Sequence, residues 1–256
     1  MSTVVCVTGM HRSGTSLTAS WLQVCGMTID DGRLYGPGPG NPQGHFEDAD
    51  FAELHRGYLA GLNPRSRGWI ITERLRFDPG VAFLAAAQEL VTKRNLRYKL
   101  WGWKDPRTTL FLEAWKQTIP GLKVLLLWRP CYDVVRSLIK RKQKTSLSDY
   151  QIGWLRAIKT WRTYNHALLD FRQHHPYDSI VLPIYDLIER DRETIGLINQ
   201  RFGLSLQWQP LAGVYDPKLL EARRFSVVAS CIGRVMQIYT TEQMLQRESD
   251  RLGVTS

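Results

Sequence analysis

The stretch VTGMHRSGTS, residues 7–16, decides the fold class of this chain. Gly9 and Gly14 have the G-x-x-x-x-G spacing of a phosphate-binding loop, and two hydroxyl residues follow the second glycine. The residues just before the loop, from 3 to 8, are β-branched or apolar without alternation, as in a strand that is buried on both faces. From Thr15 the chain can continue as a helix. Strand, glycine turn and helix in this order predict an anion site at the helix N-terminus.

The residue after the second glycine narrows the choice of anion. Thr15 stands where a nucleotide triphosphatase has the lysine that reaches the β and γ phosphates. Arg12 offers a positive charge two positions before Gly14 instead. This change favours a ligand with one phosphate at this point over a triphosphate. The alternative is an ordinary strand-to-helix turn that binds nothing.

Outside this loop, predicted strands and helices alternate, which indicates an α/β fold with a largely parallel sheet. Further strands are predicted in RYKLWGW (97–103), KVLLLW (123–128) and SIVLPI (179–184). Helices are predicted at about 48–60, 80–94, 107–118, from Cys131, 150–173, 192–202 and from about Arg234. Residues 31–45 are crowded with Gly and Pro and are predicted to form a long loop, and residues 140–149 a basic loop.

The composition indicates which binding partners and which cellular compartment to expect. A formal net charge of +10 makes the surface attractive to a polyanionic cofactor, an acidic acceptor, nucleic acid or a membrane surface. Four cysteines without a C-x-x-C pair indicate neither a zinc site nor a disulfide framework, so a cytoplasmic setting is expected. No apolar run approaches the roughly 20 residues of a membrane span. Because we find no helix-turn-helix, zinc-finger or RNP-like pattern, we expect no nucleic-acid partner.

Two further motifs carry chemistry. Arg129 ends the strand KVLLLW and Ser137 lies eight positions later in the next predicted helix, so this pair can clasp a phosphate across a strand-to-helix junction. WGWKDPR, residues 101–107, places Lys104 at the end of another strand, at the edge of the sheet where ligands bind. Asp105 is a candidate cap for the next helix, and Arg107 a candidate partner of an acid. The alternative is that Arg129 and Lys104 are ordinary surface cations.

The glycine loop, GMHRSGTS, resembles the 5'-phosphosulfate loop of sulfotransferases that use 3'-phosphoadenosine 5'-phosphosulfate (PAPS), in particular the bacterial, carbohydrate and tyrosylprotein branches. The resemblance implies that five residues hold the 5' phosphate and the sulfuryl bridge: Arg12, Ser13, Gly14, Thr15 and Ser16. Arg129 and Ser137 resemble the pair that binds the 3' phosphate in this family. Lys104 resembles the lysine of its K-D-P turn, which implies that it stabilises charge on the bridging oxygen.

The expected base lies in the Gly/Pro-rich loop. The animal cytosolic branch has a histidine shortly after the lysine of its middle motif, but this sequence has none there. GNPQGHFED, residues 40–48, resembles the N-P-x-G-x-x-E segment of bacterial relatives, so we take Glu47 as the first choice for the base and His45 as the second. The alternative for Glu47 is a catalytically idle acid at a helix N-terminus. Tyr185, in PIYDL, is one position out of the family's Y-E-D-L-type pattern and receives no role.

We therefore predict one P-loop-like, three-layer α/β domain, residues 1–256, with a central mostly parallel sheet flanked by helices. The implied reaction is in-line transfer of the sulfuryl group of PAPS to a hydroxyl or amine of a small-molecule or carbohydrate acceptor, releasing adenosine 3',5'-bisphosphate. Glu47 acts as the base, and Arg12 and Lys104 stabilise charge. No metal is expected, because no pyrophosphate is broken. The sequence leaves the acceptor and the oligomeric state open.

Two other classes are kept as alternatives. A P-loop small-molecule or nucleotide kinase requires magnesium and an acidic residue at the end of a central strand, whereas the strongest strand here ends in Trp128 and Arg129. A non-catalytic polyanion or nucleic-acid-binding module would use the positive charge for phosphate contacts alone.

Overall fold

The central strand of the sheet is β1 (Thr3–Gly9), whose residues from Val4 onwards are all buried. A computed structural model of the chain describes residues 2–29, 31–36, 44, 46–62, 70–73, 78–143, 152–214 and 232–251. Within them the sheet has the order β2-β1-β3-β4 and every pair of neighbours is parallel. The other strands are β2 (Leu100–Lys104), β3 (Lys123–Trp128) and β4 (Ser179–Pro183). The predicted α/β class with a central parallel sheet is confirmed.

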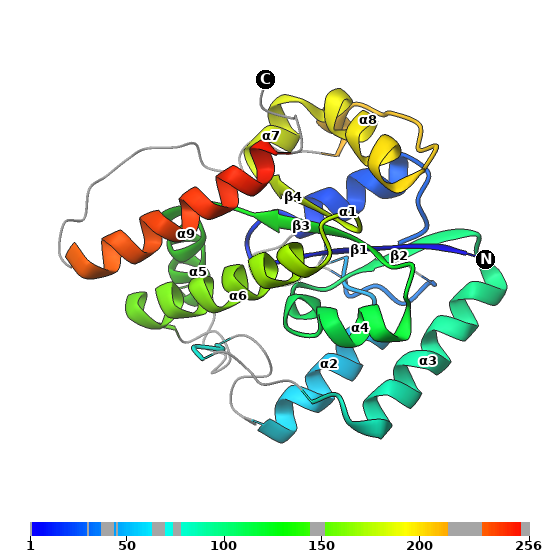
Figure 1. The fold of residues 1–256 in the computed structure, drawn as a ribbon, viewed down its shortest axis with the longest axis horizontal. Coiled ribbons are helices and arrows are strands. Elements are labelled where there is room, and N and C mark those ends of the chain that lie inside the picture. The colour runs from blue at the N-terminus through cyan, green and yellow to red at the C-terminus, as the bar shows by residue number, and fades with distance from the viewer. Residues whose placement is uncertain are drawn as a thin grey trace.

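Helices lie on both sides of this sheet (Figure 1). Side chains along a strand alternate between its two faces, so successive residues of β1 enter different cores. Val5 and Val7 pack in a core with three helices: α1 (Thr15–Val24), α7 (Ile184–Glu189) and α8 (Asp191–Phe202). Val4 and Cys6 pack in a second core with the remaining helices: α2 (Ala49–Leu62), α3 (Gly80–Arg97), α4 (Leu112–Thr118), α5 (Cys131–Gln143), α6 (Trp154–His174) and α9 (Ile232–Asp250).

Most predicted elements are present, with three differences. Helix α7 was not predicted, because its six residues are too few to show a helical period. The basic segment predicted as a loop from residue 140 is helical as far as Gln143, since Leu138 and Arg141 lie on the buried side of α5. The predicted helix over 107–118 is split into a 3₁₀ turn, η1 (Pro106–Leu110), followed by α4.

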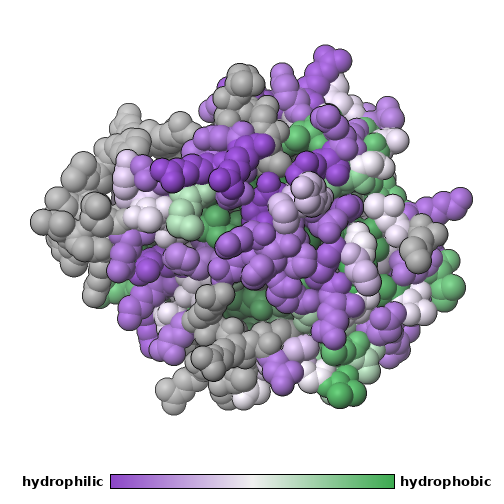
Figure 2. Space-filling view, viewed as in Figure 1, coloured by the Kyte–Doolittle hydropathy of each residue, from purple (hydrophilic) through white to green (hydrophobic). Residues whose placement is uncertain are grey.

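The surface agrees with the composition. In Figure 2 hydrophilic residues cover most of the described part of this face, and hydrophobic residues gather only in small groups. Among the described helices, none is both long and apolar enough to cross a membrane.

Close approach of strands β1 and β2 requires a glycine at residue 102. A Cβ built on Gly102 would lie 1.9 Å from the backbone oxygen of Val5. Gly121 provides a control, because a Cβ there meets no atom within 4 Å. We expect Gly102→Ala to lower the free energy of unfolding by about 2 kcal/mol or more, the usual scale of overpacking, and Gly121→Ala to leave it nearly unchanged. Urea unfolding of both variants measures this, and equal values would contradict the packing of β1 on β2.

Candidate active site

The loop between β1 and α1 has the geometry of an anion-binding turn. Gly14 is left-handed with a φ of 89°, and a Cβ there would lie 2.3 Å from the Cδ1 atom of Ile184. Arg12 is also left-handed, with a φ of 71°, which is rare for a residue other than glycine and concentrated at functional sites. The hydroxyl of Ser13 is fully buried and has no hydrogen-bond partner within the described structure. A buried hydroxyl without a partner is costly, so the loop is suited to a ligand that supplies one.

Arg12 connects the glycine loop with the second predicted phosphate motif, Arg129 and Ser137. Its Nε donates to the Oγ of Ser137 on α5 at 2.8 Å. Its backbone oxygen accepts a long contact from Nη1 of Arg129, at 3.5 Å. The structure therefore brings Arg12, Arg129 and Ser137 together, but Ser137 contacts Arg12 rather than Arg129.

Two residues to which the sequence analysis gave no role join this group. The hydroxyl of Tyr185 accepts from Nε of Arg129 at 3.3 Å and donates to Asp133 at 2.6 Å. Arg141 is buried one turn after Ser137 on α5. Burial first, and then the positive charges of Arg141 and Arg129, lower the pKa of Arg12 to about 10. Arg12 thus remains charged at neutral pH, and the converging cations favour a bound anion.

Helix α9 holds the chain on both sides of Arg129. Before it, the indole Nε1 of Trp128 donates to the Oγ of Ser249 at 3.2 Å. After it, the backbone N–H of Cys131, the first residue of α5, donates to the carboxylate of Glu242 at 2.7 Å. Arg129 is therefore presented by two residues that the C-terminal helix anchors.

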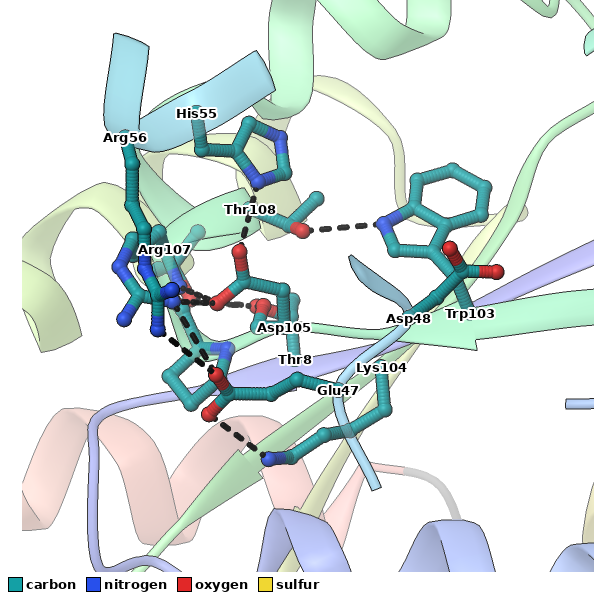
Figure 3. A network of polar contacts seen from close by, with 12 residues as sticks. Thr8, Glu47, Asp48, His55, Arg56, Trp103, Lys104, Asp105, Arg107 and Thr108 are labelled. Atoms are coloured by element: carbon teal, nitrogen blue, oxygen red, sulfur yellow. Dashed lines mark hydrogen bonds and ion pairs between the residues drawn. The ribbon is translucent and has the colours of Figure 1, made fainter. Parts of the chain in front are cut away.

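A second cluster contains the predicted base (Figure 3). Glu47 is 3% exposed and Lys104 is 1% exposed. Nζ of Lys104 donates to Oε1 of Glu47 at 3.3 Å, and Nη1 of Arg107 donates to Oε2 at 3.4 Å. Arg56, on α2, lies 3.7 Å from Oε2 and keeps 35% of its side chain exposed. The structure thus brings Glu47 and Lys104 together, and it adds Arg107, whose contact with Glu47 the sequence did not indicate.

These neighbours decide the charge of the carboxylate. Burial alone raises the pKa of Glu47, but the positive charges of Lys104 and then Arg107 outweigh it and lower the pKa to about 2. Burial lowers the pKa of Lys104, and the negative charge of Glu47 opposes that effect. Glu47 is therefore ionised at neutral pH, and it becomes a better base only if these cations turn away from it.

The cap of helix α2 is Asp48, not Glu47. Oδ1 of Asp48 accepts from the backbone N–H of Asp50 at 3.0 Å, and its other oxygen accepts from Nη2 of Arg94 at 2.8 Å. The backbone oxygen of Glu47 accepts from the backbone N–H of Tyr35 at 2.9 Å. The neighbouring residues thus hold the backbone, and the Glu47 side chain is left for the cluster with Lys104.

Asp105 and Arg107 have the structural roles that the sequence predicted. Asp105 caps η1, because its side chain accepts from the backbone N–H of Arg107 at 3.0 Å. The same carboxylate accepts from Nη1 of Arg107 at 2.7 Å. On its other oxygen it contacts His55, a residue of α2 to which the sequence gave no role. Among the described residues, no group of three His, Cys, Asp or Glu side chains is arranged to hold a metal ion.

His45, the second choice for the base, lies outside the described residues. The histidine in the glycine loop, His11, is described. His11 precedes Arg12, is 2% exposed, and has its Nε2 3.4 Å from the hydroxyl of Tyr164. Burial first, and then the positive charge of Arg107, lower its pKa to about 3. The imidazole is therefore neutral at physiological pH, between the Arg12 group and the Glu47 cluster.

This neutral histidine predicts an acid dependence of stability. The pKa of His11 falls from 6.5 in a model peptide to about 3 in the folded protein, so below pH 6.5 the unfolded chain takes up a proton that the folded chain does not. The free energy of unfolding should then fall by up to about 1.4 kcal/mol per pH unit from this residue as the pH drops towards 3. Denaturant unfolding between these pH values should show a flatter dependence for His11→Gln. His174→Gln, at an exposed histidine, is the control. An unchanged slope for His11→Gln would contradict the assignment of a buried, neutral imidazole to His11.

Three solved structures with a similar fold are sulfotransferases or sulfotransferase domains. The sulfotransferase domain from the Synechococcus PCC 7002 olefin synthase matches 95% of this chain and 94% of its own, at 18% identity and a TM-score of 0.54. The sulfotransferase domain from the curacin biosynthetic pathway matches 91% and 82%, at 13% identity and a TM-score of 0.53. Sulfotransferase STF1 from Mycobacterium tuberculosis matches 96% and 76%, at 17% identity and a TM-score of 0.50.

In comparisons by sequence, no family model and no curated protein matches the chain. At identities below a fifth, the structural likeness concerns the fold and not the substrate. The chain has the P-loop-like α/β fold of sulfotransferase domains.

Proposed function

We propose that the protein is a PAPS-dependent sulfotransferase that acts on a hydroxyl or amine of a small-molecule or carbohydrate acceptor. The observation that carries the proposal is the position of a P-loop-like turn without the triphosphatase lysine beside a buried pair of Glu47 and Lys104. The likeness to sulfotransferase domains supports it through the fold.

The residues of the turn fit a nucleotide phosphate on three grounds. The buried Ser13 hydroxyl has no partner in the described structure. The first turn of α1 follows the left-handed Gly14, so its amide groups and dipole favour a negative charge there. Arg12, Arg129 and Arg141 lie close enough for the latter two to lower the pKa of Arg12, and a bound anion would relieve their repulsion.

We assign the residues accordingly. The 5' phosphate would be held by the loop Arg12, Ser13, Gly14, Thr15 and Ser16, and the 3' phosphate by Arg129 and Ser137 with Arg12 between them. PAPS, when bound, supplies an activated sulfuryl group that passes to the acceptor and leaves adenosine 3',5'-bisphosphate behind. Nζ of Lys104 donates towards the oxygen on which charge develops, and Glu47 takes the acceptor proton at Oε1 or Oε2.

Glu47 becomes a competent base when Lys104 turns away from it. With Lys104 and Arg107 on its oxygens, its pKa of about 2 makes it a weak proton acceptor. A Lys104 that turns towards negative charge on the cofactor side lowers the positive charge at Glu47, and the pKa of the carboxylate then rises. Binding of the donor thus prepares the base for the acceptor.

The nucleotide preference is the first test. We expect adenosine 3',5'-bisphosphate to bind in EDTA, because Thr15 stands where a triphosphate site has its lysine. We expect Arg129→Ala to weaken binding by about 2 kcal/mol, the scale of a lost charge-assisted contact. Adenosine 5'-phosphosulfate, which lacks the 3' phosphate, should be much less affected by the substitution. Calorimetric titration measures both nucleotides. Binding of ATP with magnesium, and none of the bisphosphate, would instead support a kinase.

The base is tested by separating turnover from binding. Glu47→Gln should bind adenosine 3',5'-bisphosphate within a few-fold of the wild type and lose about 10²-fold or more in kcat, as expected for a missing general base. The assay is sulfate transfer from PAPS to an acceptor found by screening. The control is Asp50→Asn, which changes an acid in the first turn of α2, outside the cluster. If Glu47→Gln keeps full turnover and His45→Ala loses it, His45 is the base.

A further inference from the structure

A buried histidine lies behind the Glu47 cluster and has no role in the reaction as derived so far. His55 is completely buried on α2, and its Nδ1 lies 2.8 Å from Oδ2 of Asp105 (Figure 3). On the other side of the ring, the indole Nε1 of Trp115 donates to Nε2 at 2.8 Å. An indole N–H can only donate, so Nε2 carries the lone pair and Nδ1 carries the hydrogen. His55 therefore donates to Asp105 from one defined tautomer.

The surroundings keep this imidazole neutral. Its ring stacks on Phe111 at a centroid distance of 4.7 Å and on Phe83 at 6.4 Å. Burial lowers the pKa of His55, against the negative charges of Asp105 and Glu47 and together with the positive charge of Arg107. His55 is thus a neutral donor to a buried carboxylate, and it adds no charge to a cluster in which Glu47 and Asp105 already balance Lys104 and Arg107.

The contacts continue without a break from His55 to the predicted base. Oδ2 of Asp105 accepts from His55, and Oδ1 accepts from Nη1 of Arg107 at 2.7 Å. The same Nη1 reaches Oε2 of Glu47 at 3.4 Å. The backbone at Asp105 is held as well, because the hydroxyl of Thr8 in β1 donates to its carbonyl oxygen at 2.9 Å. One guanidinium nitrogen is thus shared between two carboxylates, and the Glu47 contact is the longer of the two.

We propose that His55 is a positioning residue for Glu47: by occupying one oxygen of Asp105, it leaves Arg107 aimed between Asp105 and Glu47. Without this donor, the exposed lone pairs of Asp105 would compete for the guanidinium and draw it away from Glu47, because an unsatisfied buried carboxylate oxygen is costly. The role as positioning residue of a base rests on the proposed function. The effect of His55 on the Glu47 carboxylate does not.

Two substitutions of similar size separate positioning from packing. In His55→Asn the amide nitrogen takes the place of Nδ1 and can still donate to Asp105, whereas His55→Leu has nearly the same shape and no donor. We expect the pKa of Glu47 to stay at about 2 in His55→Asn and to rise towards its ordinary value of 4.5 in His55→Leu. Carbon NMR of side-chain-labelled glutamate measures it, with the signal assigned by its loss in Glu47→Gln.

Further variants keep the test decisive if His55→Leu does not fold. His55→Gln places its amide near Nε2, so it can keep the contact with Trp115 but loses the one with Asp105, and it should behave as His55→Leu does. Trp115→Phe removes the indole contact and some core volume but leaves His55 and Asp105 in place. It therefore serves as a control for general loss of stability, with the pKa of Glu47 unchanged. Equal values for His55→Asn and the donor-less variants would overturn the proposal, and so would a rise in Trp115→Phe as large as in His55→Leu or His55→Gln.

Nucleotide binding and turnover separate this inference from the proposed function. With PAPS and an acceptor, His55→Leu should lose about 10- to 100-fold in kcat, because the misplaced Glu47 carboxylate loses more through poor orientation than it gains from its higher pKa. Its affinity for adenosine 3',5'-bisphosphate should stay within a few-fold of wild type. His55→Asn should recover most of the rate. If the wild type binds no such nucleotide, the proposed function fails, and the Glu47 titration still decides whether His55 acts on that carboxylate.

Discussion

Parallel pairing of β1 with β2 on one side and β3 on the other is the constraint on which the site depends. Val7 pairs with Lys104, and Gly9 pairs with Leu127. Because parallel strands end at the same edge of a sheet, the glycine loop, the Lys104 turn and Arg129 all leave the sheet there. Arg12 and Ser137 thus meet although they lie 125 positions apart in the chain.

A second constraint is the charge of the buried cluster. Ionised groups can be removed from water only if they are paired and hydrogen-bonded. Glu47 and Asp105 face Lys104 and Arg107 in contacts of 2.7 to 3.4 Å, so the four charges compensate one another. The proposed reaction moves charge at this place and would therefore redistribute these contacts, which would link the proposed cofactor side of the cluster to the Glu47 carboxylate.

The sequence predicted those parts of the molecule whose signal is local. A strand, a glycine spacing and a helix within 24 residues are enough to place Arg12 and Ser13, and a buried strand before Arg129 is enough to bring it to the same edge. Contacts between distant segments have no such pattern. The contact of Arg107 with Glu47 and that of His55 with Asp105 were missed, because the partners lie 60 and 50 positions apart in the chain. Arg141 was missed because a run of basic residues looks like a loop, although one member of it is buried.

Helix α9 holds the residues on both sides of Arg129, so the proposed site depends on this helix as well as on the sheet. Every strand of the described residues and both predicted phosphate motifs precede residue 184, so a shortened chain that stops before α9 would retain the described sheet. It would nevertheless lose the Ser249 contact of Trp128 and the Glu242 contact of Cys131, which flank Arg129. Helix α9 therefore supports the turn after β3 that carries Arg129, and the proposed binding unit extends well beyond β4.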